Sequence, residues 1–173
     1  MSRVVVVPPD PAWVEIYKTE AARVRDALGP SVVEIHHIGS TSIPGIFAKP
    51  IVDILVEATD LRDVDMRNNR MESLGYEVMG EYGIAGRRYF RKDNQDGDRI
   101  HNVHTFKSGT PGIARHLAFR DFMRAHPDLA MQYSDLKRKL AAVHPDSIEL
   151  YMDGKDGFIK EMERRAAQWQ AEL

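Results

Sequence analysis

A turn of small residues, followed by a strand that carries an acid, is the part of this sequence best suited to chemistry. Residues 36–45 read His-His-Ile-Gly-Ser-Thr-Ser-Ile-Pro-Gly, and the apolar segment 50–58 contains Asp53. A Gly-Ser turn leaves backbone N–H groups and hydroxyls uncovered, and such groups bind phosphate. A carboxylate is costly to bury without a partner, so an acid in an apolar strand indicates a functional role. The combination predicts a nucleotide or phosphate site.

The ligand-binding residues that we expect in this turn are Gly39, Ser40, Thr41 and Ser42. Taken alone, the segment is more typical of an ordinary turn, because neither the Walker pattern nor the dinucleotide glycine pattern is present. The acid on the next strand favours the functional interpretation. Lys49 supports it as well, since its point charge lies just before that strand and could reach a phosphate.

Segment 87–92, Arg-Arg-Tyr-Phe-Arg-Lys, is the second candidate wall of the site. Alternation along a strand places residues 87, 89 and 91 on one face and residues 88, 90 and 92 on the other. We expect the core to meet the face with Phe90, or the face with Tyr89 and its polar tip. The functional interpretation is an anion clamp, with Arg88 and Arg91 as ligand-binding residues. The alternative is an edge strand protected by its charge.

Two histidines are candidates for roles beside the turn. His104 lies in an apolar strand and is expected to point inward, where it and Asp53 would form a catalytic acid–base pair. The alternative for His104 is a structural, hydrogen-bonded side chain. His37 precedes the turn, and it either locks the loop through a backbone carbonyl or reaches the phosphate as a ligand-binding residue.

The periodicity of apolar residues predicts a single α+β domain over residues 1–173. Helical spacing begins at Trp13 and ends at Gly29-Pro30. Strands are expected at 32–38, 50–58, 76–79, 87–92 and 100–106, with a helix over 61–74. Helices are expected at 113–125, over the apolar face from Leu129 to Val143, and at 146–152 and 155–170. This order predicts a small mixed β-sheet with an N-terminal helix and a helical C-terminal half packed on it.

Composition narrows the classes of function. The 173 residues carry a net charge of −2, so no general basic field favours nucleic acid as a partner. The absence of cysteine excludes disulfides, thiol catalysis and thiolate metal sites, and it fits a reducing cytosol. The four-valine run near the N-terminus is too short for a signal peptide or a membrane span. We therefore expect a cytoplasmic protein without a membrane partner; the sequence leaves its oligomeric state open.

Several long motifs resemble the GrpB family. They are His-Ile-Gly-Ser-Thr-Ser-Ile-Pro-Gly at 37–45, Lys-Pro-Ile-Val-Asp-Ile at 49–54, and the segments at 117–127, 133–137 and 154–159. The resemblance extends over roughly residues 8 to 170, and the family is grouped with the polymerase-β-like nucleotidyltransferase fold. It implies that the Gly-Ser turn holds a triphosphate and that strand carboxylates hold Mg²⁺.

The strand departs from an active nucleotidyltransferase at the second acid. In that superfamily two acids lie two residues apart, because side chains at i and i+2 point the same way, about 7 Å apart, and can share a metal pair. The corresponding neighbours of Asp53 are Ile51 and Leu55, and neither can bind a metal. Asp53 would therefore be the sole strand ligand of any Mg²⁺, with waters and substrate phosphates completing the coordination.

Three functions remain open at this stage. The first is a nucleotidyltransferase-like protein that binds a nucleotide or phosphorylated small molecule at the Gly-Ser turn and performs Mg²⁺-dependent nucleotidyl transfer. The second is a non-catalytic nucleotide or anion sensor that has lost the second metal-binding acid. The third is a hydrolase or ligase for a small phosphorylated or carboxylate substrate, with Asp53 and His104 as its acid–base pair.

Overall fold

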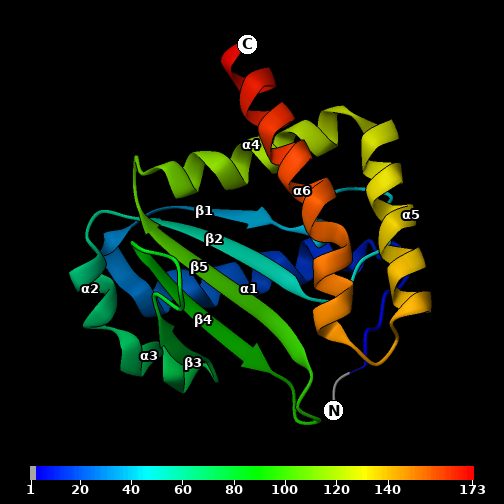
Figure 1. Ribbon diagram of the computed structural model, residues 1–173. Helices are drawn as coiled ribbons and strands as arrows, with labels where there is room; N and C mark the ends of the chain where they lie inside the picture. Colours follow the sequence, from blue (N-terminus) through cyan, green and yellow to red (C-terminus); the bar gives the residue numbers. More distant parts are fainter. Residues whose placement is uncertain (1–2) are drawn as a thin grey trace.

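In the computed structural model, which describes residues 3–173, a five-stranded sheet lies between two layers of helices (Figure 1). The expected domain of residues 1–173 is thus described from residue 3 on, and residues 1 and 2 lie outside the described part. The strand order is β1-β2-β5-β4-β3. Strands β2 and β5 are parallel and the other neighbours are antiparallel, so the sheet is mixed, as the sequence predicts.

The strands lie close to where the alternating patterns place them. Their bounds are β1 Val32–Ile38, β2 Val52–Ala58, β3 Glu77–Gly80, β4 Arg87–Asp93 and β5 Arg99–Lys107. Pro50 lies outside β2, because proline has no N–H to donate to a neighbouring strand. Register pairs Asp53 with Ile38 at the end of β1 and with Asn102 on β5, which brings the acid next to the Gly-Ser turn.

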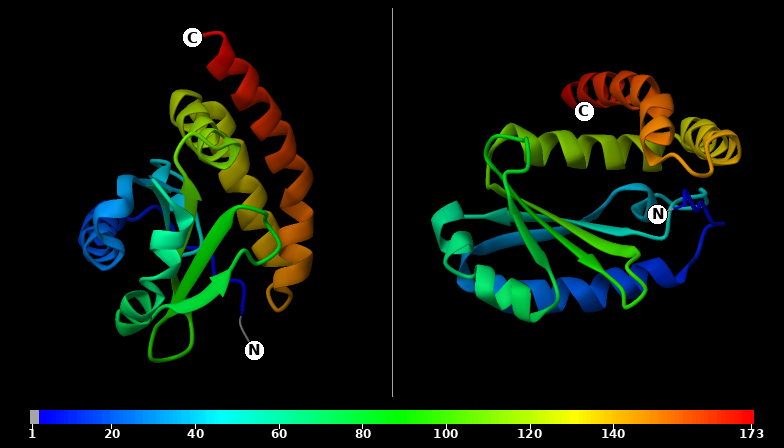
Figure 2. Two further views of the ribbon diagram at one scale, coloured as in Figure 1. Left: turned by 90° about the vertical axis from the view of Figure 1, so that its left-hand side faces the viewer. Right: turned by 60° about the horizontal axis from the view of Figure 1, so that its bottom comes forward.

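One face of the sheet packs against α1 (Ala12–Leu28), α2 (Leu61–Asp65) and α3 (Asn68–Ser73) (Figure 2). The core on this side includes Val24 and Leu28 of α1 together with Ile54, Val56 and Phe90 of the sheet. Phe90 is 1% exposed, which confirms that its face of β4 meets the core. The predicted helix over 61–74 is wrong in one respect, because the chain forms two short helices that are interrupted around residues 66–67.

The other face lies under α4 (Pro111–Ala125), which in turn packs against α5 (Pro127–Val143) and α6 (Ile148–Ala171) (Figure 2). Ile38 and Leu55 contact Ile113 of α4 on this side. Because side chains alternate along a strand, Asp53 shares this face with Leu55. The acid of β2 therefore points toward the C-terminal helices and away from α1.

Helix α6 is continuous, which corrects the expectation of separate helices at 146–152 and 155–170. Two glycines inside it, Gly154 and Gly157, suggest a break by their low helix propensity. Gly154 instead serves packing, since a Cβ there would collide with Leu140 of α5. The missing side chain lets α5 and α6 approach closely at this point.

Candidate functional site

A pocket of about 210 Å³ opens between the Gly-Ser turn, the adjacent ends of β2 and β5, and helices α5 and α6. It receives side chains from segments that are far apart in the sequence. The residues that line it are Ser40, Lys49, Ile51, Asp53, Asn102, His104, Lys137, Tyr151, Met152 and Lys155. Ser40, Lys49, Asp53 and His104, all expected site residues, therefore share one cleft.

Asp53 is held by polar neighbours on β5. Its side chain is 24% exposed, its Oδ1 accepts a hydrogen bond of 3.0 Å from Asn102 Nδ2, and His104 Nε2 lies 3.6 Å away. Burial alone would raise the pKa of Asp53, but His104, the Asn102 amide and Lys49 together lower it. The acid is accordingly a carboxylate at neutral pH.

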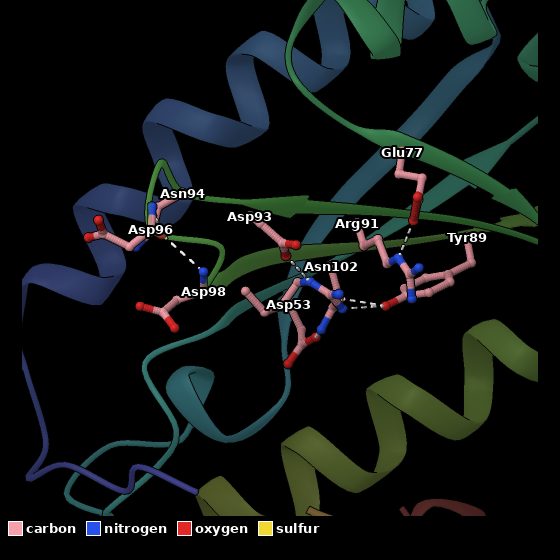
Figure 3. Close-up of polar contacts among 10 residues, drawn as sticks. Asp53, Glu77, Tyr89, Arg91, Asp93, Asn94, Asp96, Asp98 and Asn102 are labelled. Carbon is pink, nitrogen blue, oxygen red and sulfur yellow. Dashed lines mark hydrogen bonds and ion pairs between the residues drawn. The ribbon is translucent and has the colours of Figure 1, made fainter. Parts of the chain in front are cut away.

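The partners of Asp53 are themselves oriented. Tyr89 Oη donates a hydrogen bond of 2.7 Å to Asn102 Oδ1, which leaves the amide nitrogen of Asn102 to face Asp53 (Figure 3). Arg87 lies 3.4 Å from His104 Nδ1, and because arginine can only donate, that nitrogen accepts. His104 then carries its proton on Nε2, on the side of Asp53.

Three lysines converge on the pocket from different elements. Lys137 of α5 is 1% exposed, Lys155 of α6 is 8% exposed, and Lys49 lies in the loop before β2. Lys137 Nζ lies 4.3 Å from the ring centroid of Tyr133, while Lys155 and Lys49 lie 5.1 and 5.4 Å from that of Tyr151. We refer to Lys49, Lys137 and Lys155 as the lysine cluster.

No side chain of residues 3–173 forms an ion pair with the lysine cluster, although the charge of Asp53 acts on Lys49 and Lys155. Among residues 3–173, ion pairs engage Lys18, Lys92 and Lys160 but none of these three lysines. Lys137 Nζ and Tyr151 Oη are buried polar atoms without a hydrogen-bond partner in the same part of the chain. Native proteins rarely bury polar groups unpaired, so these two atoms are free to bind a water molecule or a ligand.

Burial and mutual repulsion weaken the basicity of the cluster. Burial, followed by the charges of Lys155 and Lys49, lowers the pKa of Lys137 to about 7. Burial and the charge of Lys49 lower the pKa of Lys155 to about 8, against the opposing effect of Asp53. The pKa of Lys49 is also lowered, chiefly by burial. An anion that enters the pocket would reverse these effects and favour the protonated lysines.

The helical sequence explains how two of these lysines reach the interior. Tyr133-x-x-x-Lys137 on α5 and Tyr151-x-x-x-Lys155 on α6 repeat one spacing, and residues four apart lie on the same face of a helix. Each lysine thus extends the stripe of a buried tyrosine. We did not predict Lys137 or Lys155 as site residues, although this repeated pattern was a signal that could have identified them.

The Gly-Ser turn is fixed by contacts that use most of its polar groups. Ser42 Oγ donates to the Gly39 carbonyl at 2.5 Å, and Thr41 Oγ1 lies 2.9 Å from His37 Nε2. Gly39 has φ 76°, and a Cβ there would collide with the Asp53 carboxylate. Ser40 is the residue of this turn whose side chain lines the pocket. Gly39 therefore allows Asp53 to approach, and Thr41 and Ser42 hold the loop.

The structure places His37 as a support of the loop. The ring is buried, stacks on Tyr17 with centroids 4.7 Å apart, and contacts the Thr41 hydroxyl rather than a backbone carbonyl. Burial and the nearby charges of Arg124 and Arg120 lower the pKa of His37 to about 4. His37 is thus neutral at physiological pH and lies outside the set of pocket-lining residues.

The expected clamp of Arg88 and Arg91 needs correction. Arg88 Nε donates to Asp65 of α2 at 2.7 Å. Figure 3 shows the second pair, in which Arg91 Nε donates to Glu77 of β3 at 2.5 Å. Neither arginine lines the pocket. These arginines hold the edge of the sheet, while the lysine cluster provides the positive charge at the pocket.

A match to one protein family covers nearly the whole chain. The family described as GrpB protein matches residues 3–165. The chain belongs to the GrpB family. YqkA from Bacillus subtilis is 48% identical over 91% of this chain, and the chain spans 45% of the length of that relative.

Two solved structures resemble this GrpB protein. The GrpB structure from Enterococcus faecalis has a TM-score of 0.92 and 44% identity, and the match covers 96% of this chain and 99% of that one. Terminal uridylyl transferase 4 from Trypanosoma brucei, solved with bound dUTP, has a TM-score of 0.53 at 12% identity over 83% of this chain and 51% of its own. The fold is therefore nucleotidyltransferase-like, as expected. In residues 3–173 no helix is both long and apolar enough to cross a membrane.

Proposed function

We propose that this protein binds a nucleotide or another phosphorylated small molecule in the pocket that is formed by Ser40, Asp53 and the lysine cluster. One observation carries the proposal: three lysines that form no ion pair in residues 3–173 surround a cavity that holds a single carboxylate, Asp53. Burying an ammonium group is costly unless it is paired, so this arrangement favours a ligand of negative charge. Lysine ammonium groups commonly bind phosphate, and the likeness to a nucleotidyltransferase fold is consistent with that chemistry.

Calorimetry and thermal shift with a panel of nucleotides and phosphorylated metabolites test this proposal. A ligand present at 100 times its Kd stabilises the folded state by about 2.7 kcal/mol, which a thermal shift detects readily. We expect Lys137→Met and Lys155→Met each to weaken binding about tenfold or more, because each removes a charged hydrogen-bond donor.

The matched controls are Lys139→Met on α5 and Lys160→Met on α6. Both residues are exposed lysines on the same helices, so they change net charge equally without touching the pocket. If the pocket variants and the control variants lose equal ligand affinity, the loss comes from the change in net charge and not from contacts in the pocket. The proposal fails if no phosphorylated compound of the panel shifts the melting temperature or produces heat.

A second candidate function is proton transfer on the bound ligand. Its support is the pair of Asp53 and His104, 3.6 Å apart in the same pocket as Ser40. His104, with its proton on Nε2, is placed to exchange a proton with a ligand group, and Asp53 is placed to stabilise the charged ring. Turnover of the best-binding ligand should then disappear in His104→Gln while binding persists. Turnover that survives this substitution would eliminate the candidate.

A further inference from the structure

The residues at the pocket fit Mg²⁺ poorly. Magnesium requires six oxygen ligands in near-octahedral geometry and usually takes one or two carboxylates in addition to phosphates. Asp53 is the only pocket-lining carboxylate among residues 3–173, and its Oδ1 already accepts from Asn102. The position for a second strand acid is Leu55, which is buried against α4. Within the described chain no group of three His, Cys, Asp or Glu side chains could hold a metal ion.

The nearest acid along the same strand is also engaged. Glu57 lies 2.6 Å from His36 and accepts a hydrogen bond from Ser108 Oγ. It is four residues from Asp53, which separates the two by about 13 Å along an extended strand. Glu57 therefore does not complete a metal site with Asp53.

The charge at the pocket has the sign that a bare phosphate chain requires. Three lysines, which a bound anion would keep protonated, face one carboxylate, and a free triphosphate carries more negative charge than its magnesium complex. In a partly buried site the attraction between opposite charges is several times stronger than in water. Bound Mg²⁺ would add positive charge to a cluster whose members already repel one another, since the lysine charges add to burial in lowering the pKa of Lys137 and Lys155.

The unpaired donors are also too numerous for a single phosphate oxygen. Each ammonium has three N–H groups, and the lysines come from a loop, from α5 and from α6. The unpartnered hydroxyl of Tyr151 adds another donor, and the Nζ atoms of Lys49 and Lys155 both lie near the ring of this tyrosine. A chain of phosphates presents oxygens in several directions and can satisfy this distributed set.

The pocket is small for a complete nucleotide. Its volume of about 210 Å³ is below the 300–1,000 Å³ typical of pockets that enclose drug-sized ligands. It suits a phosphate chain better than a base and ribose together. A nucleoside attached to that chain would extend beyond the pocket.

We propose that the lysine cluster takes the place of Mg²⁺ in this protein and binds the bare chain of a di- or triphosphate, so that the phosphates rather than the base determine affinity. This inference rests on the proposed function, because it specifies the ligand of the same pocket. It assigns the neutralisation of the phosphate charge to Lys49, Lys137 and Lys155.

The test is calorimetric titration with inorganic tripolyphosphate, pyrophosphate and phosphate, each in EDTA and again with excess Mg²⁺. We expect tripolyphosphate to bind in EDTA, with affinity falling about tenfold or more for each phosphate removed, since each removal loses charge-assisted hydrogen bonds. Added Mg²⁺ should weaken binding, because it competes with the lysines for the same oxygens. Adenosine and uridine triphosphates should bind within a few-fold of each other.

Asp53→Asn separates a lysine site from a metal site. A site in which Asp53 holds Mg²⁺ loses affinity in this variant, whereas a lysine site gains affinity because a repelling carboxylate is removed. We expect about tenfold tighter binding of tripolyphosphate in EDTA. Lys139→Met serves as the matched control for Lys137→Met, and circular dichroism verifies that each variant is folded.

Different failures lead to different conclusions. Binding that appears only with Mg²⁺, or that disappears in Asp53→Asn, overturns the lysine-for-metal inference but leaves the proposed function intact. Equal affinity for phosphate and tripolyphosphate also overturns the inference, because the length of the phosphate chain would then have no effect on binding. If no phosphorylated compound binds in either condition, the proposed function itself is wrong.

Discussion

Replacing Lys137 with methionine should stabilise the protein while it weakens ligand binding. Lys137 is 1% exposed, and its pKa falls from 10.5 to about 7 on folding. A fall of this size corresponds to a ceiling of roughly 5 kcal/mol for the cost of keeping the charge buried. Methionine retains the flexible apolar stem and removes the charge, but it also removes the contact of the ammonium with the Tyr133 ring, worth about 0.5–2 kcal/mol. We expect a net gain of about 1–4 kcal/mol.

The gain should depend on pH in one direction. Between about pH 7 and 10.5 the unfolded chain holds a proton on Lys137 that the folded chain has lost, so the stability of the original protein rises with pH in this window. Below pH 7 both states are protonated and the full cost of the buried charge is present. The advantage of Lys137→Met should therefore be largest near about pH 6 and should shrink toward pH 10.

Urea unfolding of both proteins near about pH 6 and about pH 9.5 measures this dependence. In thermal unfolding at the lower pH, the melting temperature should rise by about 2–16 °C, given about 2–4 °C per kcal/mol for a chain of this size. Lys139→Met, on the exposed side of the same helix, should change stability by less than about 0.5 kcal/mol at either pH. A loss of stability in Lys137→Met, or a gain of equal size at both pH values, would refute the reasoning.

Three further predictions follow from the site. The affinity for a phosphorylated ligand should fall as pH rises through about 7 and 8, because Lys137 and Lys155 must be protonated to bind. The titratable groups around these two lysines are Lys49, Asp53, His104, Tyr133 and Tyr151. A calorimetric Kd that does not change with pH would contradict this prediction. Gly39→Ala should lower the free energy of unfolding, measured in urea, by about 2–4 kcal/mol and abolish ligand binding. The reason is that the φ of 76° disfavours a side chain and that a Cβ would collide with Asp53. Unchanged binding would show that the turn has no role at the pocket. Arg88→Ala should lower the free energy of unfolding by about 1 kcal/mol or less and leave ligand affinity unchanged, because Arg88 pairs with Asp65. Reduced affinity would support the predicted arginine clamp.

The fold was predictable because its elements carry clear local patterns. Short apolar segments between turn residues identified the strands, and helical spacing with Gly29 and Pro30 after it identified α1. The errors arose where tertiary packing overrides propensity. Gly154 reads as a helix breaker, but close packing against Leu140 keeps α6 continuous.

The expected site residues that lie close together in sequence also line one pocket, while their roles stay predictions. Ser40 and Lys49 lie in the loop that joins β1 to β2, Asp53 lies at the start of β2, and the strand register brings the three together. Arg88 was placed at the pocket because alternation predicts the face of a strand on which a residue lies but not the side chain that it contacts. In the structure Arg88 contacts Asp65 of α2. The sequence allowed His37 either to support the loop or to contact a phosphate. The contact of its ring with Thr41, which only the structure shows, favours support of the loop.

The sequence by itself determined the turn, the lone acid at Asp53 and the family, since each is written in contiguous residues. Only the tertiary structure showed that Lys137 and Lys155 meet Asp53, because the packing of α5 and α6 over the sheet depends on contacts between segments about 100 residues apart. A lysine in a helix normally extends into water. Close packing of the two helices instead buries these two lysines and places them in one pocket with Asp53 and with Ser40 of the Gly-Ser turn.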